Sequence, residues 1–372
     1  MTPADRARVE LASRSFDRIL LIKPSSLGDV VHALPVLHGL RGRYPHARID
    51  WLIGSAFAPL LEGCAEIDEL VIFDRRRFGR IGRSGGATVA FIRFVRELRA
   101  RRYELVIDLQ GLFRTGFLAR ASGAAVRVGF ADAREGAWVF YTHRLQPTDP
   151  DAHAVDRNYL VAGLFGFADT PIEFKLSLDD AVRADAARLH RESGVTDEAT
   201  VVAVVPGARW ETKVWLPERF AETIDTLQSD AKVRCVLLGG ADEVELCARI
   251  AGCCRSKPVN LAGRTTLRQL AAVLERADVV LCHDSAAMHL ATALGRPLVC
   301  LVGPTNPLLT GPYRRPEDVV RVPLSCSPCY LRKLSKCGYD HRCMRDLSTS
   351  MVVDAVCNAL DKNRRRINAA VV

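Results

Sequence analysis

Residues 18–29 read RILLIKPSSLGD, and the fold of the first half of the chain can be argued from this stretch. Arg18–Ile22 predicts a strand, and a helical pattern follows over Val30–Arg41. A strand that is apolar throughout belongs in a parallel sheet with helices on both faces. Gly28 permits a tight turn from the strand into the helix, and Asp29 is expected where the helix begins.

Strand and helix patterns alternate along both halves of the chain. In the first half, further strands are expected at Ala47–Ile53, Glu69–Phe73, Tyr103–Leu109 and Val126–Phe130, and helices at Thr88–Arg101 and Gly111–Ala121. Prolines weaken the pattern between Tyr141 and Leu178, around the periodic stretch Val155–Phe165. It then restarts, with strands expected at Val201–Val205, Val233–Leu238, Val259–Leu261, Val279–Cys282 and Leu298–Val302, and helices at Glu218–Leu227, Glu243–Ala251, Leu267–Arg276 and Ser285–Leu294.

The alternation predicts an α/β protein with two Rossmann-like parallel-sheet domains. The boundary is expected near Thr170–Leu178, which gives domains of residues 1–175 and 176–372. At 372 residues the chain also exceeds the size at which a single core usually keeps growing. A ligand is expected in a cleft, outside the carboxyl ends of the strands.

Composition excludes several classes of protein. A hydrophobic content of 48% with 26% charged residues excludes wholesale disorder. No apolar run approaches the roughly 18–20 residues of a membrane span, and Met1–Arg18 lacks an apolar signal core. Most of the twelve cysteines are interpreted as reduced thiols. These features predict a cytoplasmic protein.

The net charge of +9 is clustered on the sequence. Arginines cluster at Arg75–Arg83, at Arg93–Arg102 on an expected helix, and in the tail at Lys362–Arg366. Such patches attract phosphates, anionic sugars, nucleic acid or an acidic membrane surface, although a plain solvated face is an equal alternative for the helix and the tail. Because glycines interrupt Arg75–Arg83, a flexible loop that captures an anionic ligand is expected there.

Asp29 has two interpretations that do not exclude each other. It is an N-cap candidate, because a carboxylate accepts backbone N–H bonds at the positive end of a helix. Alternatively, it is the general base that removes the proton from an acceptor hydroxyl as that oxygen attacks an anomeric carbon.

Residues 206–217, PGARWETKVWLP, follow the first strand of the second half. Lys213 lies between that strand and a helix started by Pro217, so its ammonium can reach a phosphate in the cleft. Thr212 adds a hydroxyl donor to the same oxygens. The alternatives are a solvated loop lysine and, for Trp215, a core aromatic residue.

Residues 282–289, CHDSAAMH, form another strand-to-helix junction. Small residues from Ser285 to Ala287 let an anion approach the free N–H groups of the helix start. Asp284 is the expected N-cap, and an ordinary capped helix is the alternative. His289, one turn into the helix, faces the same phosphates or is a core histidine.

Two further features leave alternatives open. After another strand, Asp242 or Glu243 accepts from ribose hydroxyls or caps the next helix. Near the end, Cys326, Cys329, Cys337 and Cys343 form a C-x2-C-x7-C-x5-C array, for which structural zinc, packed thiols and a local disulfide are alternatives. Neither half contains a Gly-x-Gly-x-x-Gly fingerprint or a P-loop, which argues against a dehydrogenase or an NTPase.

Together, five stretches in this order resemble glycosyltransferase family 9, the ADP-heptose:lipopolysaccharide heptosyltransferases, from about Arg18 to Leu347. The stretches are Ser26–Asp29, Trp210–Pro217, Asp284–His289, Gly303–Thr305 and Cys326–Cys343. The resemblance implies a GT-B architecture, an inverting transfer, and no metal or other cofactor. It also leaves open that the last helix packs back on the first domain.

The resemblance also implies roles for individual residues. Asp29 is similar to the family's proposed base, and Lys213 is the second catalytic candidate. For the donor diphosphate the resemblance implies Thr212, Lys213 and the backbone of Ser285, Ala286 and Ala287. The residue patterns described above add Asp242, Glu243, Asp284 and His289 as expected donor-binding residues. The acceptor, an anionic lipid-linked saccharide, is expected at Ser26, Gly28, Arg76, Arg80, Gln110 and Arg114, near Asp108 and Gly111.

The implied partners are therefore a nucleotide-diphosphate sugar, this acceptor, and the cytoplasmic face of an inner membrane as a peripheral contact. Alternatives are a same-fold transferase with another sugar or acceptor, and a non-catalytic protein that binds a nucleotide or an anionic glycan. A nucleic-acid-binding protein is not supported, because no aromatic-interleaved basic stretch is present.

Overall fold

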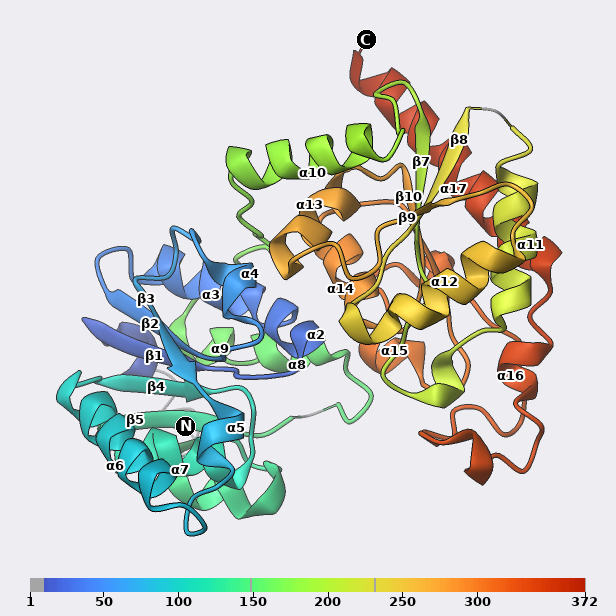
Figure 1. Ribbon diagram of the computed structural model, residues 1–372. Coiled ribbons are helices and arrows are strands. Elements are labelled where there is room, and N and C mark those ends of the chain that lie inside the picture. Colours follow the sequence, from blue (N-terminus) through green and yellow to red (C-terminus); the bar gives the residue numbers. More distant parts are fainter. Residues whose placement is uncertain (1–9, 148, 231, 372) are drawn as a thin grey trace. The chain divides into compact units, whose positions relative to one another are not determined.

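The computed structural model describes residues 10–147, 149–230 and 232–371. The stretch from Met1 to Arg18, used above to argue against a signal core, lies partly outside these residues. The chain divides into two compact units between Ser177 and Leu178 (Figure 1). Within the described residues each unit holds one sheet of six strands, all paired in parallel.

The first unit is an alternating α/β layer structure. Its strands are β1 Arg18–Ile22, β2 Arg48–Gly54, β3 Glu69–Phe73, β4 Leu105–Asp108, β5 Val126–Phe130 and β6 His143–Leu145. Its helices are α2 Leu27–Val31, α3 Leu34–Arg43, α4 Ala58–Leu61, α5 Arg75–Phe78, α6 Gly85–Ala100, α7 Phe113–Ala121, the 3₁₀ segment η1 Arg134–Phe140, α8 Ala154–Tyr159 and α9 Ala162–Phe165.

The second unit repeats the scheme. Its strands are β7 Thr200–Val205, β8 Val233–Leu237, β9 Val259–Asn260, β10 Val279–His283, β11 Leu298–Leu301 and β12 Val319–Val320. Its helices are α10 Asp180–Glu192, η2 Glu211–Lys213, α11 Pro217–Leu227, η3 Ala241–Glu243, α12 Val244–Cys253, α13 Leu267–Arg276, α14 Ala286–Ala293, α15 Pro307–Thr310, η4 Pro316–Asp318, η5 Leu334–Lys336, α16 Arg342–Arg345 and α17 Thr349–Val371.

The strand order identifies the switch point of each sheet, the place where the order of successive strands reverses. The orders are β3-β2-β1-β4-β5-β6 and β12-β11-β10-β7-β8-β9, which is the Rossmann arrangement in both units. Connections leave in opposite directions from β1 and β4, and again from β7 and β10. These two switch points are the places where open α/β sheets bind ligands.

Buried apolar strands and one face of each flanking helix make up the cores. In the second unit the cluster includes Trp215, Phe220 and Ile224, and it extends to Val352 and Val356 of the last helix. α17 packs on α11, β10 and β11, all of them in its own unit. The expectation that the last helix packs back on the first domain stays a prediction.

Several expected elements differ from the structure. The helix expected over Val30–Arg41 is two helices, α2 and α3, because Pro35 in the first turn of α3 lacks the N–H that a continuous helix needs. Arg75–Arg83 is not simply a loop, since Asp74 accepts from the Arg77 amide and caps the short helix α5. The sequence patterns missed the short edge strands β6 and β12 and the exposed helix α10.

Within the described residues, no helix combines the length and the apolar character needed to cross a membrane.

Candidate active site

The turn after β1 presents Asp29 at the switch point of the first sheet. Ser26 is the N-cap residue of α2, and Asp29 is the third residue of the helix. The Asp29 carboxylate accepts from the Ser26 amide at 2.8 Å and from the Ser26 hydroxyl at 2.7 Å. The expectation that Asp29 is the N-cap residue was therefore wrong. Asp29 is the third residue of the helix, and its carboxylate completes a capping box with the N-cap residue Ser26. Its side chain remains 40% exposed, so the carboxylate is oriented yet reachable.

Lys23 was not among the expected site residues, although it stands beside Asp29. Its Nζ donates to the Leu109 carbonyl at 2.6 Å and lies 3.6 Å from Asp29 Oδ1. Burial lowers the pKa of Lys23, while Asp29 and Asp108 raise it. The ammonium orients one carboxylate oxygen of Asp29. A lysine directly after a fully apolar strand was the available sequence signal.

The end of β4 supplies the other side of this switch point. Asp108 is fully buried, and it accepts from the Gln110 and Gly111 amides and from the Tyr141 hydroxyl. Burial raises the pKa of Asp108, and these hydrogen bonds lower it. Gly111 has a φ of +64°, which favours glycine in this turn. Asp108 therefore stabilises the loop that follows β4 by accepting hydrogen bonds from its amides.

The expected acceptor residues are only partly brought together. Gln110 Oε1 accepts from the Ser25 amide at 3.4 Å, which places Gln110 next to Ser26 and Asp29. Gly28 lies within the first turn of α2 and is buried, so it forms helix rather than the tight turn expected. The other three residues lie elsewhere and are exposed: Arg76 on α5 and Arg80 just after it, both following β3, and Arg114 on α7.

Lys213 and Asp284 meet at the switch point of the second sheet. Lys213 Nζ lies 2.7 Å from Asp284 Oδ2 and donates to the Asp284 carbonyl at 3.0 Å. The same carboxylate oxygen accepts from the buried Thr305 hydroxyl at 2.6 Å. The ammonium also stands 4.6 Å above the Trp210 ring. Lys213 is therefore a largely buried cation whose ammonium is fixed by its contacts with Asp284, and the solvated-lysine alternative was wrong.

The N-terminus of α14 adjoins this pair. Ser285, not Asp284, is the N-cap residue, and no side chain caps the helix, so the N-cap expectation for Asp284 was wrong. Ser285 Oγ is buried and has no hydrogen-bond partner among the described residues. The first amides of α14, from Ala286 and Ala287, follow it. Uncapped amides and an unpaired hydroxyl form a set of donors suited to an anion. His289 follows one turn later and is half-buried.

The hydroxyl of Thr212 is engaged in a hydrogen bond within the fold. Thr212 is buried, and its hydroxyl donates to the Leu331 carbonyl. His341 Nε2 donates to the Thr212 carbonyl at 2.8 Å, and the Leu334 amide donates to Glu211. Because its one hydroxyl proton is used, Thr212 acts in this structure as an anchor for the turn that carries Lys213.

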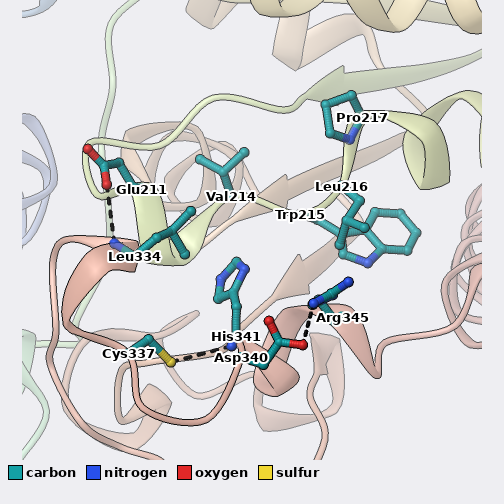
Figure 2. A pocket seen from close by; sticks show the side chains of 10 residues that line it. All are labelled: Glu211, Val214, Trp215, Leu216, Pro217, Leu334, Cys337, Asp340, His341 and Arg345. Atoms are coloured by element: carbon teal, nitrogen blue, oxygen red, sulfur yellow. Dashed lines mark hydrogen bonds and ion pairs between the residues drawn. The ribbon is translucent and has the colours of Figure 1, made fainter.

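A cavity of about 450 Å³ lies behind this turn. Figure 2 shows the side chains that line it, from Glu211–Pro217 and from Leu334–Arg345. Trp215 and His341 line it from the two sides, and Asp340 pairs with Arg345 at its edge. None of the expected donor-binding side chains lines this cavity. The cavity lies between these two segments, which support the turn that carries Lys213, and it is not the candidate active site.

The Cys326–Cys343 array lines a second cavity of about 250 Å³. All four thiols are free, so the disulfide alternative was wrong. Burial and the three neighbouring cysteines raise the pKa of Cys343 to about 11. In the described part of the chain, no three His, Cys, Asp or Glu side chains come close enough together to hold a metal ion. The thiols do not fit the zinc alternative as they stand.

His283 ends β10 and is fully buried beneath the site. Its Nε2 accepts from the Trp215 amide at 2.9 Å. Burial is the main reason that its pKa falls to about 3. The buried imidazole is therefore neutral at physiological pH, and it connects β10 to the segment that carries Lys213.

We expect His283 to make folding stability depend on pH. The unfolded chain binds a proton at this residue near pH 6.5, whereas the folded protein does so only near pH 3. Stability is therefore lost as pH falls through that window, by about 3 kcal/mol at pH 4. Denaturant unfolding at pH 7 and pH 4 should show a smaller loss for His283→Gln than for the parent. A variant at an exposed histidine, His46→Gln, should retain the parent's loss; equal losses in all three would contradict the prediction.

Glu243 is the last residue of η3, which follows β8, and it lies beside the turn after β7. Its Oε2 accepts from the Gly240 amide at 2.8 Å, and a Cβ on Gly207 would lie 1.7 Å from its Oε1. Burial raises the pKa of Glu243. The close approach places a carboxylate oxygen directly over the turn after β7, where it can accept from sugar hydroxyls. Asp242 is exposed next to it.

The Gly207→Ala substitution should lower nucleotide-sugar affinity while leaving the free energy of unfolding nearly unchanged. The added methyl group collides with the end of a flexible side chain, so the Glu243 carboxylate moves while the fold persists. We expect nucleotide-sugar affinity to fall about tenfold, equivalent to one lost hydrogen bond to a charged group, with a stability change under about 1 kcal/mol. Calorimetric titration and denaturant unfolding measure the two effects. Gly252→Ala, where a Cβ meets nothing within 4 Å, is the control and should retain affinity; unchanged affinity in Gly207→Ala would refute the idea.

Comparisons with known proteins show the family to which the chain belongs. The family model described as "Glycosyltransferase family 9 (heptosyltransferase)" matches residues 91–339. The chain is 28% identical over 310 residues to the lipopolysaccharide core heptosyltransferase OpsX of Haemophilus influenzae, an alignment covering 82% of this chain and 84% of that protein.

Two solved structures resemble the chain over nearly its whole length. The glycosyl transferase family 9 structure from Veillonella parvula aligns at a TM-score of 0.80 with 25% identity, covering 94% of this chain and 99% of that one. E. coli heptosyltransferase WaaC with ADP-2-deoxy-2-fluoro heptose aligns at 0.70 with 26% identity, covering 93% and 99%. The α/β fold class expected from the sequence is confirmed, and so is the resemblance: this chain belongs to glycosyltransferase family 9, the heptosyltransferases, and is a glycosyltransferase of the GT-B type.

Proposed function

We propose that this glycosyltransferase moves a heptose from ADP-heptose to a saccharide acceptor of the lipopolysaccharide-core type, with inversion at the anomeric carbon. The relatives are named for heptose transfer to lipopolysaccharide, and one was solved with an ADP-heptose analogue. In this proposal residues 1–175 bind the acceptor and residues 176–372 bind the nucleotide sugar. The observation that carries the proposal is the uncapped α14 N-terminus with the unpaired Ser285 hydroxyl beside Lys213.

The proposed chemistry is a direct displacement. An acceptor hydroxyl oxygen bonds to the anomeric carbon, its proton passes to Asp29, and the bond from that carbon to the diphosphate oxygen breaks. Asp29 suits the role because Ser26 and Lys23 fix its carboxylate. Departing ADP gains negative charge, which Lys213, Ser285 and the α14 amides stabilise. Glu243 is proposed to accept from the ribose hydroxyls.

No residue in this scheme needs a metal ion, and we propose that the donor is a substrate with no separate cofactor. We place the protein on the cytoplasmic face of the inner membrane. Supporting this placement, the twelve cysteines are free thiols, which suits a reducing compartment.

A panel of nucleotide sugars tests the donor. ADP-heptose should raise the melting temperature and bind with its affinity unchanged when metal is chelated, while UDP- and GDP-sugars should not stabilise the protein. Mass spectrometry and NMR should then find a heptose added, with inverted configuration, to a heptose-deficient core saccharide. Binding of another nucleotide sugar with turnover would make the protein a same-fold transferase of different substrate. Binding of ADP-heptose without turnover would make it a binding protein.

A further inference from the structure

α6, α7 and η1 carry an unusual surface on the first unit. α6 packs on α7, and α7 packs on η1 (Figure 1). Ring contacts join all three elements, since Phe117 of α7 stacks on Phe91 of α6 and meets Phe140 of η1 edge-on. We refer to the exposed residues of α6, α7 and η1 as the α6–η1 face.

The α6–η1 face exposes large apolar side chains, whereas the water-exposed surface of a protein is normally more polar. Val89, Phe113 and Val139 are each more than half exposed, and Ile92, Phe117 and Trp138 are each more than a third exposed. Only Ala87 and Leu98 of the sixteen residues of α6 are fully buried. Single exposed apolar side chains need no explanation, but six of them on three elements that pack on one another point to an interaction surface.

The same surface is strongly basic. The three elements carry six arginines, all of them exposed, against two acidic residues, so the face attracts anions; the arginines are Arg93, Arg96, Arg99, Arg114, Arg120 and Arg134, and the acidic residues are Glu97 and Glu135. Along α6, Val89, Ile92, Arg93, Arg96 and Arg99 are exposed and spaced three or four residues apart, which puts them on one stripe of the helix. Within the described residues, no carboxylate pairs with Arg93, Arg96 or Arg99.

We propose that the α6–η1 face docks on the surface of an anionic phospholipid bilayer. Arginines meet lipid phosphates while exposed aliphatic and aromatic side chains enter the headgroup boundary, the combination by which interfacial helices bind membranes. Trp138 suits this depth, with Arg144 stacked 4.8 Å over its ring. The inference rests on the proposed function in one respect: the proposed acceptor is linked to a membrane, and docking brings the enzyme to it.

Other occupants fit the α6–η1 face less well. A second copy of the face would bring two basic surfaces together, which costs free energy. A nucleic acid would satisfy the arginines but leave Val89, Ile92 and Val139 in water. Only a bilayer with an anionic surface and an apolar layer just beneath it matches both the arginines and the exposed apolar side chains.

Vesicle co-sedimentation of the full chain tests the proposal. The parent should bind phosphatidylcholine vesicles that contain phosphatidylglycerol, less so at high salt, and bind pure phosphatidylcholine only weakly. Arg93→Gln/Arg96→Gln/Arg99→Gln should lower partitioning by roughly a hundredfold, as expected for about 1 kcal/mol per arginine near the surface. Val89→Gln/Ile92→Gln should lower it about tenfold through lost insertion of apolar side chains.

Matched controls lie on the other unit. Arg364→Gln/Arg365→Gln/Arg366→Gln removes three exposed arginines from α17, and Met351→Gln/Leu308→Gln removes two exposed apolar side chains. Both should bind like the parent. The proposal fails if the α6 variants bind like the parent, if the controls lose binding equally, or if duplex DNA competes vesicles off at equal charge concentration.

Activity separates this proposal from the proposed function. The α6 variants should transfer sugar to a water-soluble, delipidated acceptor at the parent rate, and more slowly to an acceptor embedded in vesicles. Loss of both activities in folded α6 variants would overturn the docking role. Absence of transfer by the parent, with vesicle binding intact, would overturn the proposed function and leave the docking surface standing.

Discussion

Asp29→Ala is expected to lower the rate of sugar transfer by about 10²–10⁴-fold, the usual contribution of a general base. Affinity for ADP should not change, because Asp29 and the proposed diphosphate site lie in different units. Single-turnover kinetics with saturating donor, together with calorimetric titration of ADP, measure the two effects.

The capping role of Asp29 has to be separated from proton transfer. Asp29→Asn keeps an oxygen that can accept from Ser26 but cannot take the proton, so its rate should fall like that of Asp29→Ala while its stability stays near the parent's. Gln269→Ala breaks an equivalent capping box in α13, at a cost of about 1 kcal/mol, and should retain activity. If Asp29→Asn transfers at the parent rate, Asp29 is only a cap.

Lys213→Ala is expected to have the second large effect, on both binding and folding. Removing the ammonium deletes a cation proposed to contact the diphosphate, so ADP affinity should fall about 10²-fold, or roughly 3 kcal/mol for a charged hydrogen-bonded pair. It also leaves the Asp284 carboxylate, only 7% exposed, without its cation. Breaking such a pair costs about 3 kcal/mol of stability.

A double variant distinguishes the two consequences of losing Lys213. Lys213→Ala/Asp284→Asn removes the uncompensated charge and should recover most of the stability while ADP binding stays weak. Lys336→Ala, an exposed lysine on a neighbouring segment, should change neither. Parent-like ADP affinity in the folded double variant would mean that the diphosphate binds elsewhere.

The patterns along the chain were sufficient to predict the two parallel sheets. Their central strands are mostly apolar, and burial on both faces admits few other arrangements. The edge strands His143–Leu145 and Val319–Val320 escaped prediction, whereas the similarly short edge strand Val259–Asn260 was expected. The split between α2 and α3 depends on a single proline within an otherwise helical pattern.

The candidate residues divide in the same way. The sequence by itself placed Asp29, Lys213 and Ser285 after strand ends, since strand-to-helix junctions are local features. Only the tertiary structure decided how these residues are held, because the contacts join distant segments. Lys23 meets Leu109, Lys213 and Thr305 share one oxygen of Asp284, and Thr212 turns toward Leu331.

The exposed arginines show the same limit. The charge of Arg93, Arg96 and Arg99 is evident in the sequence, but that their helix belongs to the same group of packed elements as exposed Phe113 and Val139 is decided by how α6, α7 and η1 pack. The sequence determined which side chains have chemistry to offer and which strands carry them, because periodicity and turn residues act locally. The fold decided which of them share a surface or a hydrogen bond, because those pairings join residues far apart in the chain.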